Sequence, residues 1–362
     1  MGQNIWLSRI NKFKDVAIWS ATAALRSVPS PTTLYQSLDH DYPKEPKYGQ
    51  DQIGEYVKHT NRTAYIEPLF GYVIDEQGVW LPDSIYKHYP LPEQPWRRGT
   101  PSYGRFNAAR RGRGAEVLEM DTVISLRHFW DWNFYHFYLD VLGKLQLFDM
   151  VGVPLDTPII LGAYVDQLPF PRQILNRGRL KELNWVVQGD RYIKADKIYY
   201  GRTWQPYGTR LKYLQKMMDV PSPSAPETGK RVFLTRKQTG TRHVVNMAEL
   251  LPILDKYRFE IADTADLSLA ETIDLFSDTR YLVAVHGAGM TNMMYRGDNP
   301  MSVLELHAAD WYSPSFFNIC RDYGYAHKQM TCPVGDSVRG NEANMFVDPQ
   351  QFEQEIIELL QN

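Results

Sequence analysis

Two residues capable of proton transfer lie four positions apart in the stretch Trp132–Asp140. His136 and Asp140 share one face of a helix at that spacing, so the carboxylate can orient the imidazole. A histidine held in this way is suited to general-base catalysis. We expect His136 to be the base and Asp140 to orient it, with Asp140 acting directly as the alternative. A second interpretation is a hydrogen-bonded pair inside a core helix.

A glycine turn between a buried strand and a helix forms the strongest local motif. The strand Tyr281–Val285 runs into His286 and then into Gly287-Ala288-Gly289-Met290-Thr291-Asn292. Glycines let phosphates approach the backbone, and a helix N-terminus supplies unpaired N–H groups and positive partial charge. Glu305 follows at the end of the next strand, where acids commonly accept hydrogen bonds from ribose hydroxyls. The motif predicts a nucleotide site, and the alternative is a simple tight turn.

A basic cluster follows the predicted strand Arg231–Thr235. It comprises Arg236 and Lys237, with Arg242 a few residues later. Guanidinium groups at the edge of a cleft suit a diphosphate, because their fork matches its oxygens. On their own, three basic residues in a loop are usually solvated.

Taken in order, these motifs resemble glycosyltransferase family 61. The order is Asn-x-x-His-Phe-x-x-Asp, a strand ending in Thr-Arg-Lys with a later Arg, Val-His-Gly-Ala-Gly-x-Thr-Asn, and Val-Leu-Glu-Leu. The resemblance spans about residues 117–335. That family includes plant xylan xylosyl- and arabinosyltransferases, protein O-linked N-acetylglucosaminyltransferases and bacterial capsule-type enzymes. It implies a GT-B fold, an inverting mechanism and a UDP-sugar donor.

The resemblance also implies roles for single residues. Those expected at the donor are Arg236, Lys237, Arg242, His286, Gly287, Ala288, Gly289, Thr291, Asn292 and Glu305, the arginines at the diphosphate and Glu305 at the nucleoside. Those expected on the acceptor side are Asn133, His136 and Asp140. The chain departs from the family's pattern after Asp140, where residues 141–144 replace a Leu-Pro-Arg-like continuation.

The expected reaction moves a sugar from a UDP-sugar to a hydroxyl of a glycan acceptor, in polysaccharide or glycoconjugate synthesis. A non-catalytic scaffold that binds nucleotide sugars or glycans is the alternative, and it would not need the ionisable pair His136 and Asp140. An NAD-dependent oxidoreductase fits worse, because its motif wants a third Gly or Ala where Asn292 stands and it leaves the arginines unexplained.

The pattern of elements predicts an α/β protein with two Rossmann-like, doubly wound domains that face a cleft. Strands alternate with helices on both sides of the proline-rich segment 221–229, which we expect to be a linker. The expected parts are an N-terminal extension with an amphipathic helix (1–116), an acceptor domain (117–220), a nucleotide-sugar domain (230–347) and a C-terminal helix (348–362).

Composition narrows the classes of function and ligand. The chain has 362 residues and a formal net charge of -2, so it has no global footprint for nucleic acid. Asp39-His40-Asp41 is the only Asp-x-Asp, and no buried strand precedes it. We therefore expect neither a metal nor a cofactor beyond the UDP-sugar substrate.

Features of the N-terminal third and the cysteines bear on location. Residues 5–25 read as an amphipathic helix, which predicts peripheral contact with a membrane or packing on its own domain. Six arginines and no acid occur from Arg97 to Arg113, which favours an anionic or lipid-linked acceptor or else a solvated loop. The two cysteines are expected to be free thiols in the cytoplasm.

Overall fold

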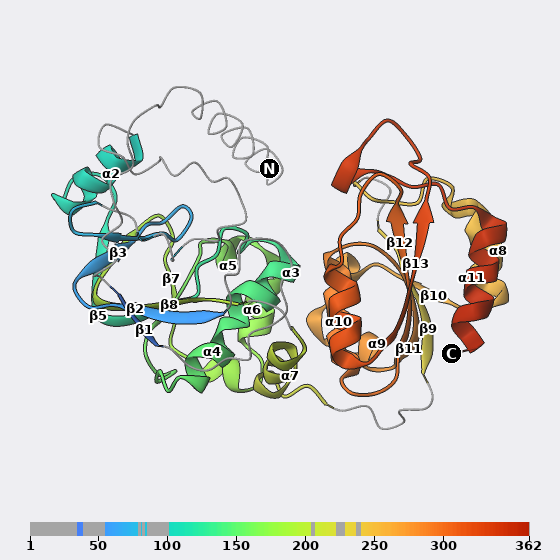
Figure 1. Cartoon of the computed structure of the whole chain (residues 1–362), viewed down its shortest axis with the longest axis horizontal. Helices are drawn as coiled ribbons and strands as arrows, with labels where there is room; N and C mark the ends of the chain where they lie inside the picture. Colours follow the sequence, from blue (N-terminus) through green and yellow to red (C-terminus); the bar gives the residue numbers. More distant parts are fainter. Residues whose placement is uncertain are drawn as a thin grey trace.

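The chain forms two units, each built on its own sheet (Figure 1). This computed structural model describes residues 55–78, 81, 84, 101–203, 207–221, 229–236 and 240–361, together with the backbone of 35–38. Several predictions therefore lie outside the described residues: the helix at 5–25, the Asp39–Asp41 loop, most of the linker, and Lys237.

The first sheet combines a parallel core with an antiparallel extension. β5, β6, β7 and β8 are parallel, with β8 and β6 on either side of β5. β2 and β3 pair antiparallel with β8, β1 with β2, and β4 with β3. The strands are β1 (Tyr35–Leu38), β2 (Tyr56–Thr60), β3 (Ala64–Ile66), β4 (Val73–Asp75), β5 (Val117–Ser125), β6 (Ile159–Leu161), β7 (Trp185–Val187) and β8 (Tyr192–Arg202).

The two faces of this sheet are covered differently. Ile124 and Ile159 pack in a core with the helices, whereas Val123 and Ile160 pack with the β3–β4 hairpin. The helices are α3 (Phe134–His136), the π-helix η4 (Phe137–Leu142), α4 (Lys144–Met150), α5 (Tyr164–Gln167), α6 (Pro169–Leu175), the 3-10 helix η5 (Gly178–Glu182) and α7 (Gly208–Met217). The prediction of helices on both faces is wrong for this sheet, because the β3–β4 hairpin packs on one of them.

The second sheet is entirely parallel, in the order β10-β9-β11-β12-β13. Its strands are β9 (Lys230–Leu234), β10 (Glu260–Ala262), β11 (Thr279–Val285), β12 (Ser302–Ala308) and β13 (Ala326–Cys332). Numbered along the chain, the order is 2-1-3-4-5, so the direction of winding reverses between β9 and β11. Ligands of open α/β sheets bind at such a reversal, beyond the carboxyl ends of the strands.

Helices cover both faces of the second sheet, as predicted. Phe233 and Val283 pack with α8 (Met247–Lys256) and α11 (Pro349–Gln361) on one face. On the other face, Leu282 belongs to the core that includes α9 (Leu269–Ser277), the 3-10 helix η7 (Ala288–Arg296) and α10 (Ser315–Tyr323). Figure 1 shows α9 and α10 on the side of the sheet toward the first unit. The remaining elements are α2 (Pro101–Arg110) and the 3-10 helices η6 (Thr264–Asp266) and η8 (Gly340–Glu342).

The two units share one buried core at their junction. The hydroxyls of Tyr138 in η4 and Tyr295 in η7 lie 2.5 Å apart, and both side chains are fully buried. Gln215 of α7 donates to the carbonyl of Met294 at 2.6 Å. Asp322 of α10 accepts from the backbone N–H of Tyr207 at 2.7 Å. These bonds hold the helices after β5 and β8 against those after β11 and β12.

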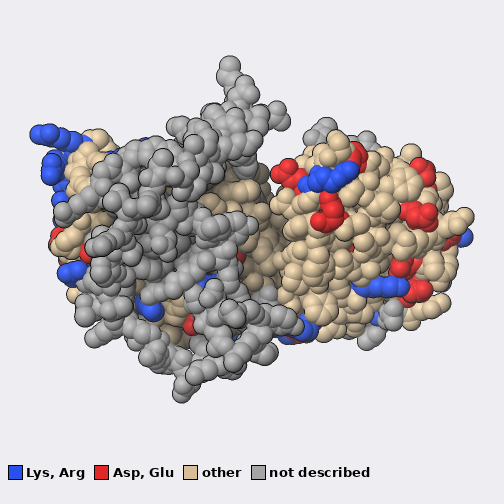
Figure 2. Space-filling view, turned by 45° about the horizontal axis from the view of Figure 1, so that its top comes forward, with Lys and Arg blue, Asp and Glu red and all other residues tan. Residues whose placement is uncertain are grey.

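The surface charge, the cysteines and the helix lengths bear on the predictions about partners and location. Figure 2 shows Lys and Arg side chains gathered at the end of the first unit that carries α2, where Arg105, Arg110, Arg111 and Arg113 are exposed. Both cysteines are buried free thiols, as predicted. Among the described residues, no helix has the length and apolar character needed to cross a bilayer.

Candidate functional site

The pair His136 and Asp140 lies where the chain turns from β5 into its helices. His136 Nδ1 is 2.6 Å from Asp140 Oδ2, and Thr203, which follows β8, donates to Asp140 Oδ1 at 3.1 Å. The side chain of Asp140 is 9% exposed and that of His136 is 23% exposed. The imidazole is therefore held from the buried side and reachable from the other.

Local sequence explains this placement. Asn133 caps the first turn, since its side-chain oxygen accepts from the backbone N–H of Tyr135 and His136. The helix expected to carry both His136 and Asp140 is instead a short α turn, a π-helix and a second α-helix that follows Gly143. A Cβ on Gly143 would lie 2.3 Å from the carbonyl oxygen of Leu139, so only glycine fits there. Short π-helical segments like this one occur frequently at functional sites.

The electrostatics of the pair favour an ionised carboxylate. Burial works to raise the pKa of Asp140, but hydrogen bonds from His136 and Thr203 and the nearby His128 outweigh it and lower the pKa to about 2. An ionised Asp140 accepts the proton on His136 Nδ1, which leaves the lone pair of Nε2 to take a proton from a substrate.

His128 is a further histidine beside this pair, and its part in the cluster was not evident from its spacing. Its ring stacks near His136, with centroids 5.5 Å apart, and its Nδ1 accepts from the backbone N–H of Trp130 at 3.2 Å. Burial, helped by His136 and Lys144, lowers the pKa of His128 to about 3 although Asp140 opposes this. It is therefore neutral near pH 7 with its proton on Nε2.

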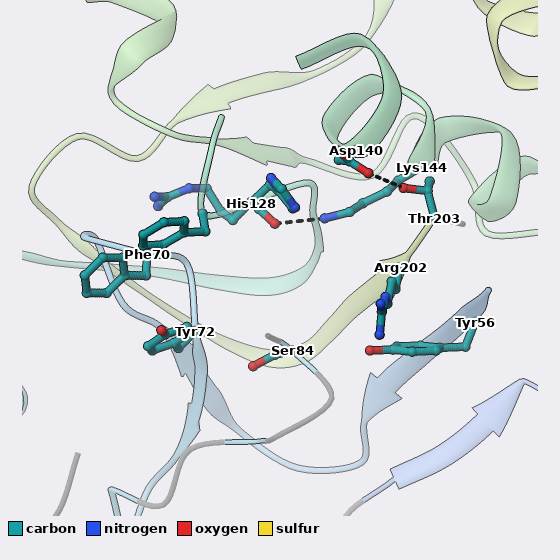
Figure 3. A pocket seen from close by; sticks show the side chains of 12 residues that line it. Tyr56, Phe70, Tyr72, Ser84, His128, Asp140, Lys144, Arg202 and Thr203 are labelled. Carbon is teal, nitrogen blue, oxygen red and sulfur yellow. Dashed lines mark hydrogen bonds between the residues drawn. The ribbon is translucent and has the colours of Figure 1, made fainter. Parts of the chain in front are cut away.

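A small pocket lies next to Asp140, beyond the carboxyl ends of β5 and β8 (Figure 3). Lys144 and Arg202 line it with Tyr56, and Figure 3 shows Arg202 pointing toward that ring. Lys144 donates to the carbonyl of Arg127 at 2.8 Å, and burial lowers its pKa to about 8. The cavity volume is about 20 Å³, which is room for about one water molecule and not for a sugar ring.

The second constellation lies at the reversal point between β9 and β11. Arg236 follows β9 and Gly287 follows β11, and Arg236 Nη1 would be 3.1 Å from a Cβ placed on Gly287. Ala288 begins η7, so its N–H and that of Gly289 belong to the first turn of that helix. The basic side chain and the glycine turn that the sequence places 51 residues apart thus lie close together, with no room for a side chain on Gly287 between them.

Arg236 and Arg242 form a concentration of positive charge with unused donors. Burial and the charge of Arg236 lower the pKa of Arg242 to about 10. Among the described residues, none accepts from Arg236 Nη1 or Arg242 Nε, although both atoms are buried. Arg242 also has a φ of 62°, in the left-handed region that is strained for a non-glycine residue. The two half-buried guanidiniums therefore offer unused donors to an anionic group.

Thr291 and Asn292 lie within η7, just after the glycine turn in sequence. Asn292 donates to the carbonyl of Gly289 at 2.8 Å and so holds the turn in shape. Both side chains are buried. Their contribution to a donor site would therefore be to support the turn.

Glu305 has different neighbours from those expected. Its carboxylate is bonded by His286 Nδ1 at 2.5 Å, His307 Nε2 at 3.0 Å and His327 Nε2 at 2.8 Å. Only 1% of the Glu305 side chain is exposed. The sequence placed Glu305 at the nucleoside itself, whereas in the structure three imidazoles separate it from solvent.

Aromatic rings connect the two constellations. The ring centroid of Tyr135 is 5.2 Å from that of His136 and 5.6 Å from that of Phe316. The ring centroids of Phe316 and His286 are 5.0 Å apart. His136 and His286, which come from different sheets, are thus linked through two aromatic side chains. A substrate that reached both histidines would pass along these aromatic side chains.

Within the part of the chain that the structure describes, two groups of side chains could supply ligands for a metal ion. The ligand atoms of His128, His136 and Asp140 lie within 4.8 Å of one another, and so do those of His286, Glu305 and His307. In each group the carboxylate already accepts a hydrogen bond from a histidine. A metal ion at either group would have to replace the hydrogen bond between the histidine and the carboxylate. No single group contains both His136 and His286 among the described residues.

Comparison with known proteins adds a family. The sequence profile of the family described as Glycosyltransferase 61 matches residues 134–303. The matched range begins just after Asn133 and ends two residues before Glu305, so it contains His136, Asp140, both arginines and the glycine turn. None of the curated proteins compared with the chain matches it.

Proposed function

The chain belongs to glycosyltransferase family 61, and on that premise we propose that it is an inverting transferase using a UDP-sugar. The family indicates a sugar donor and a glycan acceptor in general terms. Our proposal is finer: the two units form a GT-B fold, in which the second sheet binds UDP and the first activates a hydroxyl of the acceptor.

The observation that carries the proposal is the pair of half-buried guanidiniums at the reversal point of the second sheet. Arg236 and Arg242 have donors that no described residue uses, and Arg236 lies against Gly287. A diphosphate there would receive charge-assisted hydrogen bonds from both arginines and from the N–H groups of the glycine turn. Because the arginines already supply positive charge, we propose that the leaving group needs no metal.

The proposed reaction is one displacement with inversion at the anomeric carbon. His136 Nε2 takes the proton from the acceptor hydroxyl as its oxygen forms the new glycosidic bond. Asp140, 2.6 Å from Nδ1, stabilises the imidazolium that results. The bond from the anomeric carbon to the diphosphate breaks, and Arg236 and Arg242 neutralise the charge that the leaving UDP acquires.

The charge of the acceptor and the cellular location are further parts of the proposal. The exposed arginines on and after α2 favour an acceptor with negative charge, of which a lipid-linked glycan is one kind. We propose a cytoplasmic location with peripheral contact at a membrane surface.

The test is release of UDP from a panel of UDP-sugars, with and without a chelator, by the wild type and His136→Ala. We expect release from one donor, unaffected by the chelator and lost in the variant, while UDP still binds. Binding of UDP with equal release by both proteins would contradict His136 as the base. Binding of UDP with transfer to no glycan acceptor would favour a non-catalytic scaffold, and absence of UDP binding would overturn the choice of nucleotide.

A further inference from the structure

Three histidines donate to a single buried carboxylate in the second unit. Glu305 Oε1 accepts from His286 and His307, and Oε2 accepts from His327. A carboxylate can only accept, so each of these nitrogens carries its proton. Burial works to raise the pKa of Glu305, but the three hydrogen bonds outweigh it and hold the pKa well below its ordinary value.

The register of the strands brings the cluster together. Ala284 pairs with Glu305, so His286 lies level with His307 across β11 and β12, and their rings are 4.2 Å apart. His327 on β13 pairs with Val303 on β12. Val303 is two residues before Glu305, so both lie on the same face of the sheet. The cluster is therefore fixed by parallel pairing across three strands.

Glu305 determines which nitrogen of His286 is available. With the proton on Nδ1, the lone pair is on Nε2, which can only accept a hydrogen bond while the ring is neutral. Burial lowers the pKa of His286, and Arg242 and His307 add to this effect while Glu305 opposes it. Trp311 and Phe316 flank the ring with centroids at 4.9 and 5.0 Å, so it has little freedom to turn.

The position of His286 selects its partner. It is the residue before Gly287, so it adjoins the turn that contacts Arg236. No described residue bonds to its Nε2 in the structure. A phosphate oxygen would be repelled by that lone pair, whereas a hydroxyl can donate to it. On a nucleoside diphosphate held by Arg236 and Arg242, the ribose carries the nearest hydroxyls that belong to the nucleotide itself.

We infer that His286 Nε2 accepts a hydrogen bond from a ribose hydroxyl of the donor, and that Glu305, with His307 and His327, is the positioning group that fixes this tautomer. The inference rests on the proposed nucleotide-sugar donor and gives that site its selectivity. It makes the site specific for ribonucleotides over deoxyribonucleotides, through a histidine where the sequence led us to expect the glutamate.

The first experiment is titration calorimetry of wild-type protein with UDP, 2′-deoxy-UDP and 3′-deoxy-UDP. We expect one deoxy analogue to bind about 3- to 10-fold more weakly than UDP, the usual worth of one neutral hydrogen bond. Equal affinity for all three ligands would overturn the inference and leave the proposed function standing. Failure of UDP itself to bind would count against the proposed donor instead.

Two variants assign the selectivity to its residue. His286→Ala is expected to bind UDP and the deoxy analogue equally, while His59→Ala, which removes a buried histidine of the first sheet, retains the wild-type ratio. Glu305→Gln is expected to lose the ratio as well, because its amide cannot accept from all three imidazoles. Retention of the full ratio in His286→Ala would overturn the inference.

A spectroscopic measurement reads the tautomer of His286 directly in the wild-type protein. The chain has 9 histidines, so long-range nitrogen–proton correlation spectra of 15N-histidine-labelled protein are tractable. We expect His286 to show the Nδ1–H tautomer, assigned by the signal missing from His286→Ala, and its Nε2 resonance to shift with UDP and not with the weaker deoxy analogue. An Nε2–H tautomer would contradict the inference.

Discussion

Each sheet carries a histidine bonded to a carboxylate near the carboxyl ends of its strands, and the surroundings of these two pairs differ. His136 and Asp140 are 2.6 Å apart, and His286 and Glu305 are 2.5 Å apart. The side chain of His136 is 23% exposed, whereas that of His286 is 7% exposed. Asp140 shares its carboxylate with the hydroxyl of Thr203, whereas Glu305 shares its carboxylate with two more imidazoles.

This difference shows that the same pair of groups can serve two purposes. Where the imidazole is open on one side and its carboxylate is ionised, a proton can arrive on Nε2 and be stabilised. Where the imidazole is enclosed and close to Arg242, taking up a proton is opposed, and we infer that the carboxylate instead fixes the tautomer. The first pair depends on a local cap and turn, and the second depends on the register of parallel strands.

Replacing the imidazole of the first pair should have the largest effect. We expect His136→Ala to lower kcat for UDP release by about 100- to 10,000-fold, the usual contribution of a positioned base. The Kd for UDP should stay within about twofold of the wild type, since the proposed donor site lies in the other unit. An equal loss of binding and turnover would place His136 at the donor, against the division of roles proposed here.

Removing a guanidinium at the second centre should weaken binding. Arg236→Ala and Arg242→Ala are each expected to raise the Kd for UDP by about 10- to 100-fold, the range for one charged hydrogen-bond partner. Arg172→Ala is the matched control, because this exposed arginine pairs with Asp166 and belongs to neither centre. Wild-type affinity in both Arg236→Ala and Arg242→Ala, measured by calorimetry, would contradict a diphosphate at this position.

The first pair should also contribute stability that depends on pH. The folded-state pKa of Asp140, about 2, is below its ordinary value, so its contribution is present above about pH 4 and is lost as the pH falls toward 2. We expect Asp140→Asn to lower the free energy of unfolding by about 2 kcal/mol at pH 7. Urea titrations at several pH values should show the gap closing toward pH 2, and a gap independent of pH would be the contrary result.

The cap that holds the first pair should have the smallest effect of the four. Asn133→Ala removes the acceptor for the N–H groups of Tyr135 and His136 and should cost about 1 kcal/mol of stability. Because the cap positions His136, kcat should fall while the Kd for UDP is unchanged. Asn133→Asp keeps an acceptor and should restore both properties, and a variant that restores neither would show that capping is not the role of this residue.

The sequence predicted most of the second unit because its signals are local. Its buried strands read as apolar runs, and the glycine turn follows one of them directly. β13 was missed because it is an edge strand whose polar residues, such as His327, Lys328 and Gln329, do not form an apolar run. The histidine cluster could not be inferred for the same reason, since it requires the register that pairs His327 with Val303.

The first unit was harder to predict because its sheet draws on distant segments. β2 and β3 pair with β8, which follows them by more than a hundred residues. The proline-rich segment around these short strands looked irregular, so residues 1–116 were expected to be an extension. Arg202 and Thr203 come together with Asp140 only through the pairing of β5 and β8. The i, i+4 spacing of His136 and Asp140 was the one part of this centre that could be read locally.

The most direct test of the two-centre account is a crystal structure of the protein with UDP. The account predicts the diphosphate between Arg236 and Arg242, with its oxygens toward the N–H groups after Gly287, and a ribose hydroxyl at His286 Nε2. Density for UDP beside His136 and Arg202 in the first unit, with Arg236 and Arg242 making no contact with it, would contradict the account.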